Sequence, residues 1–209
     1  MFRAGLRFLV IGPALLIASW LVGNSALMAN GIDNSVDGIY MTSSGWLGKR
    51  WSRSPDHDKY CKRRGQMRMV SALIAIPFIA IGIWIDYGRN QADLAQMVVS
   101  LVAAAIVIPV AIIGRGEIHD DHDKHHGGNI LHLTIDILAA ATAAVSSIVA
   151  FVTGVAGWNL AGAIFVLLLA IWHGSSEARE AYSDFRHPES EHDHDHEPPE
   201  LHALHAKAP

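Results

Sequence analysis

Cysteine is almost absent from this chain of 209 residues, which contains only Cys61. A single cysteine excludes an intrachain disulfide and any metal site built from several thiolates. Charge is also scarce, since Asp, Glu, Lys and Arg make up 17% of the residues and hydrophobic residues 51%. No paired nucleophile and base, Gly-rich phosphate loop or cofactor motif occurs in the sequence. We therefore expect neither an enzyme nor a protein with a resident cofactor, and no nucleic-acid partner.

The hydrophobic residues are gathered into long runs. Residues 69–85 and 94–113 are nearly free of charge and long enough to cross about 30 Å of hydrocarbon. Residues 6–22 form a third such run, and residues 129–172, interrupted at GVAGWN, supply two more that are joined by a short turn. Such blocks indicate an integral membrane protein made of α-helices.

Residues 25–48 decide whether the chain crosses the membrane five or six times, because this stretch contains Asp33 and Asp37. With six helices and a cytoplasmic N-terminus, all 16 Lys and Arg residues except Arg89 fall on the cytoplasmic side, as the positive-inside rule requires. We therefore predict an all-α, six-transmembrane-helix bundle with both termini in the cytoplasm. The expected spans are about 6–23, 25–48, 68–87, 93–114, 129–153 and 158–178.

The two ends of the chain need separate interpretations. The N-terminal segment could be a cleaved signal peptide, but its apolar run is longer than the roughly 7–15 residues usual in such peptides. We therefore assign residues 1–185 to one transmembrane domain. Residues 186–209 are rich in Pro, Glu, Asp and His and poor in apolar residues, so we expect a disordered, His-rich cytoplasmic tail.

Two pairs of polar residues lie within expected spans at helical spacing. Asp33 and Asp37 are four residues apart, and so are His132 and Asp136, which puts each pair on one face of its helix. An Asp at the centre of a span costs about 2.5–3.5 kcal/mol, so these side chains should face the interior of the bundle. Two ligands from each of two helices make a four-coordinate shell suited to a divalent metal.

Other interpretations of these residues remain open. Asp33 and Asp37 could line a water-filled proton path or pair with a base, although the only Lys or Arg residues within the expected spans, Arg7 and Arg68, lie at span ends. His132 alone would be typical of a core histidine, and His173, at the end of the last span, is interpreted in that way. Without a metal, three carboxylates packed together cannot all stay ionised, so at least one would hold a proton.

The arrangement resembles a known family. The stretches GNSALMANGIDNSVDGIY, SPDHDKYCKRRGQMR, NILHLTIDILAAATAAVSSIVAF and GWNLAGAIFVLLLAIWHGSSEA are similar to the six-helix membrane domain of the cation diffusion facilitators over most of residues 5–185. The resemblance implies that Asp33, Asp37, His132 and Asp136 form the transport site. It also implies export of zinc and related divalent ions from the cytoplasm in exchange for protons, by alternating access and usually as a homodimer.

The sequence departs from the family pattern in two places. Members usually continue into a cytoplasmic metal-binding domain, whereas a short His-rich tail follows the last span here, so we expect a short member without that domain. Family members usually have an acidic residue after the Gly-Trp that opens the sixth span, and this chain has Asn159 at that position. A second metal site found in some members matches only in part, at Asp56 and His57.

Chemistry favours zinc as the substrate, with cadmium second, because three oxygens and one nitrogen suit zinc and tolerate other divalent ions. Metal binding requires neutral His132 and ionised carboxylates, which would couple transport to protons. The segments HDDHDKHH and HDHDH could gather ions or could be merely solubilising. We expect a bacterial inner membrane protein. The alternatives are a proton-coupled carrier of another solute and a membrane metal sensor or accessory protein that does not transport.

Overall fold

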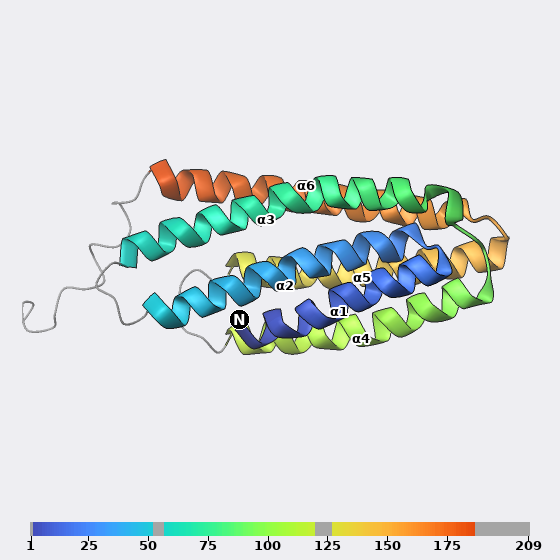
Figure 1. Cartoon of the computed structure of the whole chain (residues 1–209), viewed down its shortest axis with the longest axis horizontal. Helices are drawn as coiled ribbons and strands as arrows, with labels where there is room; N and C mark the ends of the chain where they lie inside the picture. The colour runs from blue at the N-terminus through green and yellow to red at the C-terminus, as the bar shows by residue number, and fades with distance from the viewer. Residues whose placement is uncertain (1, 52–56, 120–126, 187–209) are drawn as a thin grey trace, which may run out of the picture.

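Six long α-helices make up nearly all of the computed structural model, which describes residues 2–51, 57–119 and 127–186 (Figure 1). No strand occurs among these residues, so the all-α prediction is confirmed. The helices are α1 (Phe2–Val22), α2 (Ser25–Trp51), α3 (His57–Asp86), α4 (Leu94–His119), α5 (Gly127–Thr153) and α6 (Gly157–Arg186), with a short 3-10 helix, η1 (Tyr87–Arg89), after α3.

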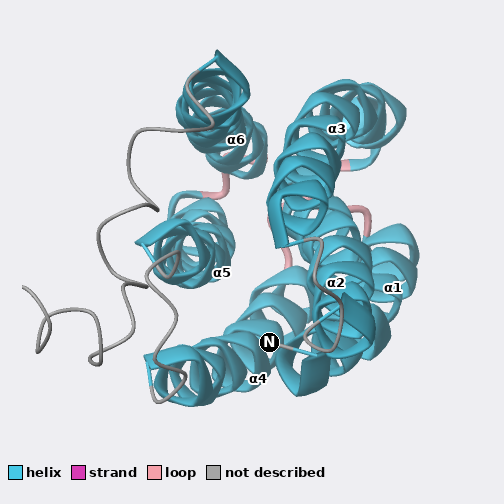
Figure 2. Cartoon of the chain, turned by 90° about the vertical axis from the view of Figure 1, so that its left-hand side faces the viewer, coloured by secondary structure: helices cyan, strands magenta, loops and turns pink. Residues whose placement is uncertain are grey.

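The helices lie side by side along the long axis of the molecule, and α2 is central among them. It packs against α1, α3, α5 and α6. Seen from one end, α4 and α6 flank α5, and α1 and α3 flank α2 (Figure 2). This arrangement brings the second and fifth helices of the chain together in the interior.

Three tight connections lie at the same end of the bundle, which we call the short-turn end (Figure 1). They are the turn at Gly23, the segment 87–93 and the turn at residues 154–156. Gly23 and Gly154 both have a φ of 69°, a left-handed conformation in which a side chain would be strained. Gly23 is also constrained sterically, because a Cβ there would collide with the backbone oxygen of Arg89.

The outer surface of the bundle is suited to lipid. Five helices contain stretches long and apolar enough to cross a membrane, namely Phe2–Val22, Met69–Arg89, Leu94–Gly114, Leu133–Thr153 and Gly157–Ser176. Large apolar side chains point outward from them, including Leu21, Trp84 and Val152, which are 76%, 82% and 75% exposed. The buried residues on the same helices are mostly small, and alanine predominates. Small residues at helix contacts and large ones outside are typical of membrane bundles.

Helix α2 is the one long helix that is not apolar enough to be recognised as a span. Its polar side chains are nevertheless buried, among them Asn24 at its start and Asn30, Asp33, Asn34 and Asp37 within it. Neighbouring helices shield these groups from the surroundings, which is the condition under which lipid tolerates polar side chains. The structure therefore has the six long helices that we predicted.

Helices α1 and α2 pack closely because glycines line their contact. Glycines recur every seven residues, at positions 31, 38 and 45 of α2 and at positions 5 and 12 of α1. A Cβ at Gly38 would lie 2.6 Å from the backbone nitrogen of Leu9, closer than atoms can approach. The backbones can therefore touch only where a side chain is missing.

Some sequence predictions fall outside the described residues. Asp56, residues 120–126 of the His-rich loop and residues 187–209 of the tail belong to this group. His57 begins α3, but its side chain is also outside the described part.

Candidate metal centre

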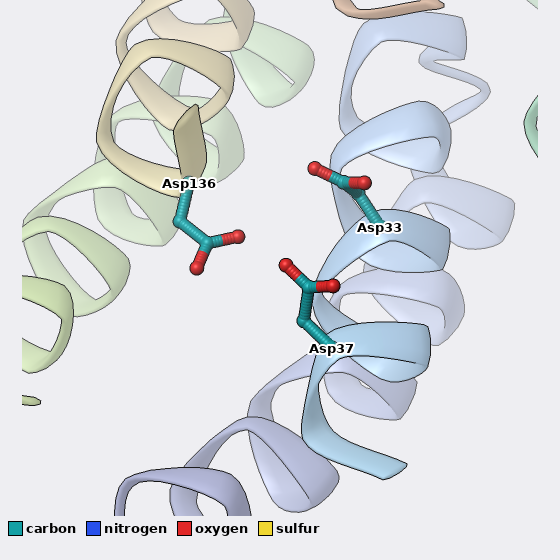
Figure 3. Close-up of side chains that lie close together, drawn as sticks. All are labelled: Asp33, Asp37 and Asp136. Carbon is teal, nitrogen blue, oxygen red and sulfur yellow. The ribbon is translucent and has the colours of Figure 1, made fainter. Parts of the chain in front are cut away.

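Helix α2 presents two aspartates to the interior. The helix begins after Asn24, whose side-chain oxygen accepts a hydrogen bond of 3.0 Å from the backbone nitrogen of Leu27, a typical N-terminal cap. Asp33 and Asp37 follow one turn apart on the same face, and they are 7% and 6% exposed. Both point toward α5 (Figure 3).

The third carboxylate comes from α5. Asp136 is completely buried and faces Asp33 and Asp37 across the gap between the two helices (Figure 3). One oxygen from each of the three carboxylates lies within 4.8 Å of the other two. The structure thus brings together three of the four residues that the sequence predicted as ligands.

His132 lies in α5 one turn before Asp136, so helical geometry puts the two residues on the same face. The His132 side chain is outside the described part of the structure, and its role as fourth ligand stays a prediction. His173 of α6 is 6% exposed and does not belong to the cluster of three carboxylates.

The spacing of the oxygens suits a small cation after a modest contraction. An ion equidistant from three oxygens separated by 4.8 Å would lie at most about 2.8 Å from each, against roughly 2.0–2.2 Å for a zinc–oxygen bond. Small rotations of the carboxylates would close that difference. Carboxylate oxygens are among the ligands of zinc, and they also suit harder divalent ions such as manganese.

Ionised carboxylates held this close together would repel one another strongly. Two ionised carboxylates whose oxygens are at most 4.8 Å apart would repel each other by at least about 3 kcal/mol at an effective dielectric constant near 20. Three ionised groups would multiply that cost, because burial removes the water that would screen them. A divalent cation between the three carboxylates would relieve this repulsion.

A buried network of polar side chains, which the sequence analysis missed, closes the short-turn end. Its members, which we call the turn-end network, are Asn24, Gln96, Ser100, Ser147 and Asn159, and each is at most 1% exposed. They come from the start of α2 and from α4, α5 and α6.

Hydrogen bonds connect the turn-end network throughout. Asn24 Nδ2 donates to Ser100 Oγ (3.1 Å) and Ser147 Oγ (2.8 Å). Ser147 Oγ lies 3.0 Å from Asn159 Oδ1, and Asn159 Nδ2 donates to Gln96 Oε1 (2.6 Å). Gln96 Nε2 in turn donates to the backbone oxygen of Gly23 (2.7 Å). Polar residues inside apolar runs are the sequence signal for such contacts, but they do not reveal the partners.

Arg89 is the one basic residue at the short-turn end among the described residues. Its guanidinium Nη1 lies 3.4 Å from Oδ1 of the fully buried Asp86, and its Cζ lies 4.0 Å from the ring centre of Trp20. It also donates a hydrogen bond to the backbone oxygen of Trp20. Asp86 further accepts a hydrogen bond of 3.0 Å from Ser19 Oγ. These contacts join α3 to α1 and account for an arginine at this end.

Apolar helices around a buried cluster of three carboxylates are typical of integral membrane proteins that handle ions in their interior. Comparison with protein families identifies the family to which the chain belongs. The family model for the cation efflux transmembrane domain matches residues 2–185, so the chain belongs to the cation diffusion facilitator family. No curated protein matches the chain.

Membership of this family establishes the general function. The chain is an integral membrane protein that transports divalent metal cations, and the metal ion is its substrate, not a cofactor. Family members are transporters and not enzymes. The sequence resemblance is therefore confirmed for the membrane domain.

Proposed function

We propose that Asp33, Asp37, His132 and Asp136 form the transport site, through which the protein exports Zn²⁺, and also Cd²⁺, from the cytoplasm in exchange for protons. The observation that carries the proposal is the convergence of three buried carboxylates within 4.8 Å. The fourth ligand, His132, is supported by its position one turn from Asp136.

The donor set favours zinc. One imidazole nitrogen and three carboxylate oxygens are all common zinc ligands, and zinc accepts four of them in a tetrahedron. Cadmium is softer and tolerates the same ligands without preferring oxygen. The absence of sulfur from the proposed ligand set argues against a site that is selective for cadmium.

Proton exchange follows from the ligands themselves. His132 must be neutral and the carboxylates ionised when metal binds, so binding releases protons. When the metal leaves, the carboxylates repel one another until protons enter. The site is therefore occupied by metal or by protons in turn, and alternating access would carry each in one direction.

The membrane setting is part of the proposal. Apart from Arg89, the Lys and Arg residues of the described helices lie toward the end opposite the short turns, which favours a cytoplasmic location for that end. The protein would then sit in a bacterial inner membrane as a homodimer, the usual assembly of the family. The short-turn end would face outward.

A flux assay tests the proposal. Purified protein in proteoliposomes should take up Zn²⁺ faster when the lumen is made acidic, because outward-moving protons drive the exchange. Asp37→Asn should lower this flux by about a hundredfold or more, since loss of second-shell partners alone costs 10–100-fold in metal sites. Uptake that does not depend on the pH gradient would refute proton exchange. Wild-type flux in Asp37→Asn would refute the proposed transport site.

Asp93→Asn is the matched control. Asp93 is outside the acidic cluster and caps α4 through a hydrogen bond of 2.8 Å from the backbone nitrogen of Gln96 to its Oδ1. Asparagine caps helices as well as aspartate does, so this variant should transport like the wild type. In cells, Asp37→Ala and His132→Ala should fail to restore metal tolerance to a host that lacks its own exporter.

A further inference from the structure

Two asparagines of α2 lie beside the acidic cluster and have no role in the site described so far. Asn30 and Asn34 are both completely buried. Asn34 Nδ2 donates two hydrogen bonds of 2.7 Å, one to the backbone oxygen and one to Oδ1 of Asn30. The other end of each amide, Asn34 Oδ1 and Asn30 Nδ2, is buried without a hydrogen-bond partner among the described residues.

The orientation of the Asn34 amide is fixed by its partners. A backbone carbonyl only accepts hydrogen bonds, so the group that approaches the Asn30 carbonyl must be the nitrogen of Asn34. The same contact fixes Asn30, which must present its oxygen to that nitrogen. Asn34 Oδ1 therefore points away from Asn30 as an unsatisfied acceptor, which is rare in a buried position and calls for an explanation.

The location of the pair suggests what that explanation is. Successive residues of a helix are about 100° apart, so the two asparagines and the two aspartates fall within an arc of about 100°. All four side chains are buried, and this arc faces the interior of the bundle. Asn30 is about one turn closer than Asp33 to the start of α2, where the turn-end network closes the bundle.

We propose that Asn34 is a further metal-contacting residue, whose Oδ1 receives the divalent cation beside the carboxylates of Asp33 and Asp37, and that Asn30 orients it. The inference rests on the proposed transport site. A neutral oxygen next to three carboxylates gives the ion a weaker second position. Ions move through a protein only if no single position holds them too tightly.

Cysteine substitution gives a direct readout of contact. Asn34→Cys replaces an oxygen by a sulfur that prefers Cd²⁺. We expect the ratio of Cd²⁺ to Zn²⁺ affinity, measured by competition on the purified protein, to rise about tenfold. This is the lower end of the roughly 10–100-fold change in metal affinity that follows when a residue around a metal site is replaced. A thiolate-to-cadmium absorbance band in the ultraviolet should appear when Cd²⁺ is added.

Thr142→Cys is the matched control, because it adds the same thiol to α5 away from the cluster. The Thr142 hydroxyl donates only to the backbone oxygen of Leu138 in its own helix, at 2.7 Å. Both variants retain Cys61, so any cadmium band from that residue appears in both. Only Asn34→Cys should change the affinity ratio and gain a further band.

A second variant tests the role in transport. Asn34→Leu should lower the maximal flux about tenfold and change Zn²⁺ affinity less than flux, because the three carboxylates hold the ion more tightly than Asn34 does. If Asn34 merely holds a buried water, both variants lose thermal stability, and Asn34→Cys shows the wild-type affinity ratio and no new band. That result overturns the inference even if Asn34→Leu does not fold.

Asp37→Asn, measured in parallel, separates the two proposals. If it transports Zn²⁺ like the wild type, the proposed site has failed and this inference fails with it. If it is inactive while Asn34→Cys keeps the wild-type affinity ratio, only the role of Asn34 is refuted.

Discussion

Asp33 is the ligand position at which metal preference can be tested most directly. It supplies one of three oxygens to the cluster, and replacement by His would convert the proposed donor set into two nitrogens and two oxygens. Imidazole suits zinc, so Asp33→His should raise the ratio of Zn²⁺ to Cd²⁺ flux. A mixed-ion competition assay in proteoliposomes measures that ratio. An unchanged or lower ratio would contradict the assignment, and Asp93→His, outside the cluster, should leave it unaltered.

The sequence predicts the acidic residues of the site better than their surroundings. Asp33, Asp37 and Asp136 could be selected because charge inside an apolar run is costly and because a spacing of four residues marks one helix face. The Asn30–Asn34 pair has the same spacing. Asparagine is uncharged, however, so its presence in an apolar helix does not mark it as a functional residue. Which way a buried amide points depends on its hydrogen-bond partners, and no sequence pattern reveals them.

At the scale of a helix, α2 illustrates how hydropathy and position diverge. Its polar residues make its hydropathy too low for it to count among the five apolar spans. Neighbouring helices nevertheless surround it on several sides. The positive-inside argument predicted the sixth helix because it counts charges in loops, not polarity within the helix. The seven-residue glycine repeat, in contrast, was visible in the sequence but did not by itself show that α1 is the partner.

The glycine contact between α1 and α2 leads to a stability prediction. Gly38→Ala places a Cβ 2.6 Å from the Leu9 nitrogen, and overpacking of this kind costs about 1–3 kcal/mol. The higher helix propensity of Ala returns up to about 1 kcal/mol. We expect a lower melting temperature in detergent and, because Asp37 is the preceding residue, a reduced Zn²⁺ flux.

Gly88→Ala is the matched control for this substitution. A Cβ at Gly88 has no atom within 4 Å, and its φ is not positive, so the melting temperature should stay close to that of the wild type. Equal melting temperatures for Gly38→Ala and Gly88→Ala would show that α1 and α2 can separate without loss, contrary to the close packing.

At the scale of the whole molecule, the turn-end network ties four helices together at the short-turn end. Its hydrogen bonds join the start of α2 to α4, α5 and α6, beyond the acidic cluster on the short-turn side. If transport alternates between two openings, these bonds must break when the short-turn end opens. The network would therefore set how often that end opens in the absence of metal.

Asn159→Leu tests this role, because it removes the contact with Ser147 and the donations to Gln96 and to the backbone oxygen of Gln91. Three bonds at about 0.6 kcal/mol each, the average inside membranes, amount to about 2 kcal/mol. Since 1.4 kcal/mol is a factor of ten, the open population should rise by about thirtyfold.

The readout is the reaction of Ser146→Cys, a buried position next to the network, with a membrane-impermeant maleimide in a Cys61→Ser background. Asn159→Leu should accelerate labelling from the short-turn side by up to about thirtyfold, the factor that corresponds to 2 kcal/mol. Thr142→Val, which loses only a hydrogen bond within its own helix, should not. Equal labelling rates in the two variants would mean that the network supports the fold without controlling access, and closure of the short-turn end would then depend on apolar packing alone.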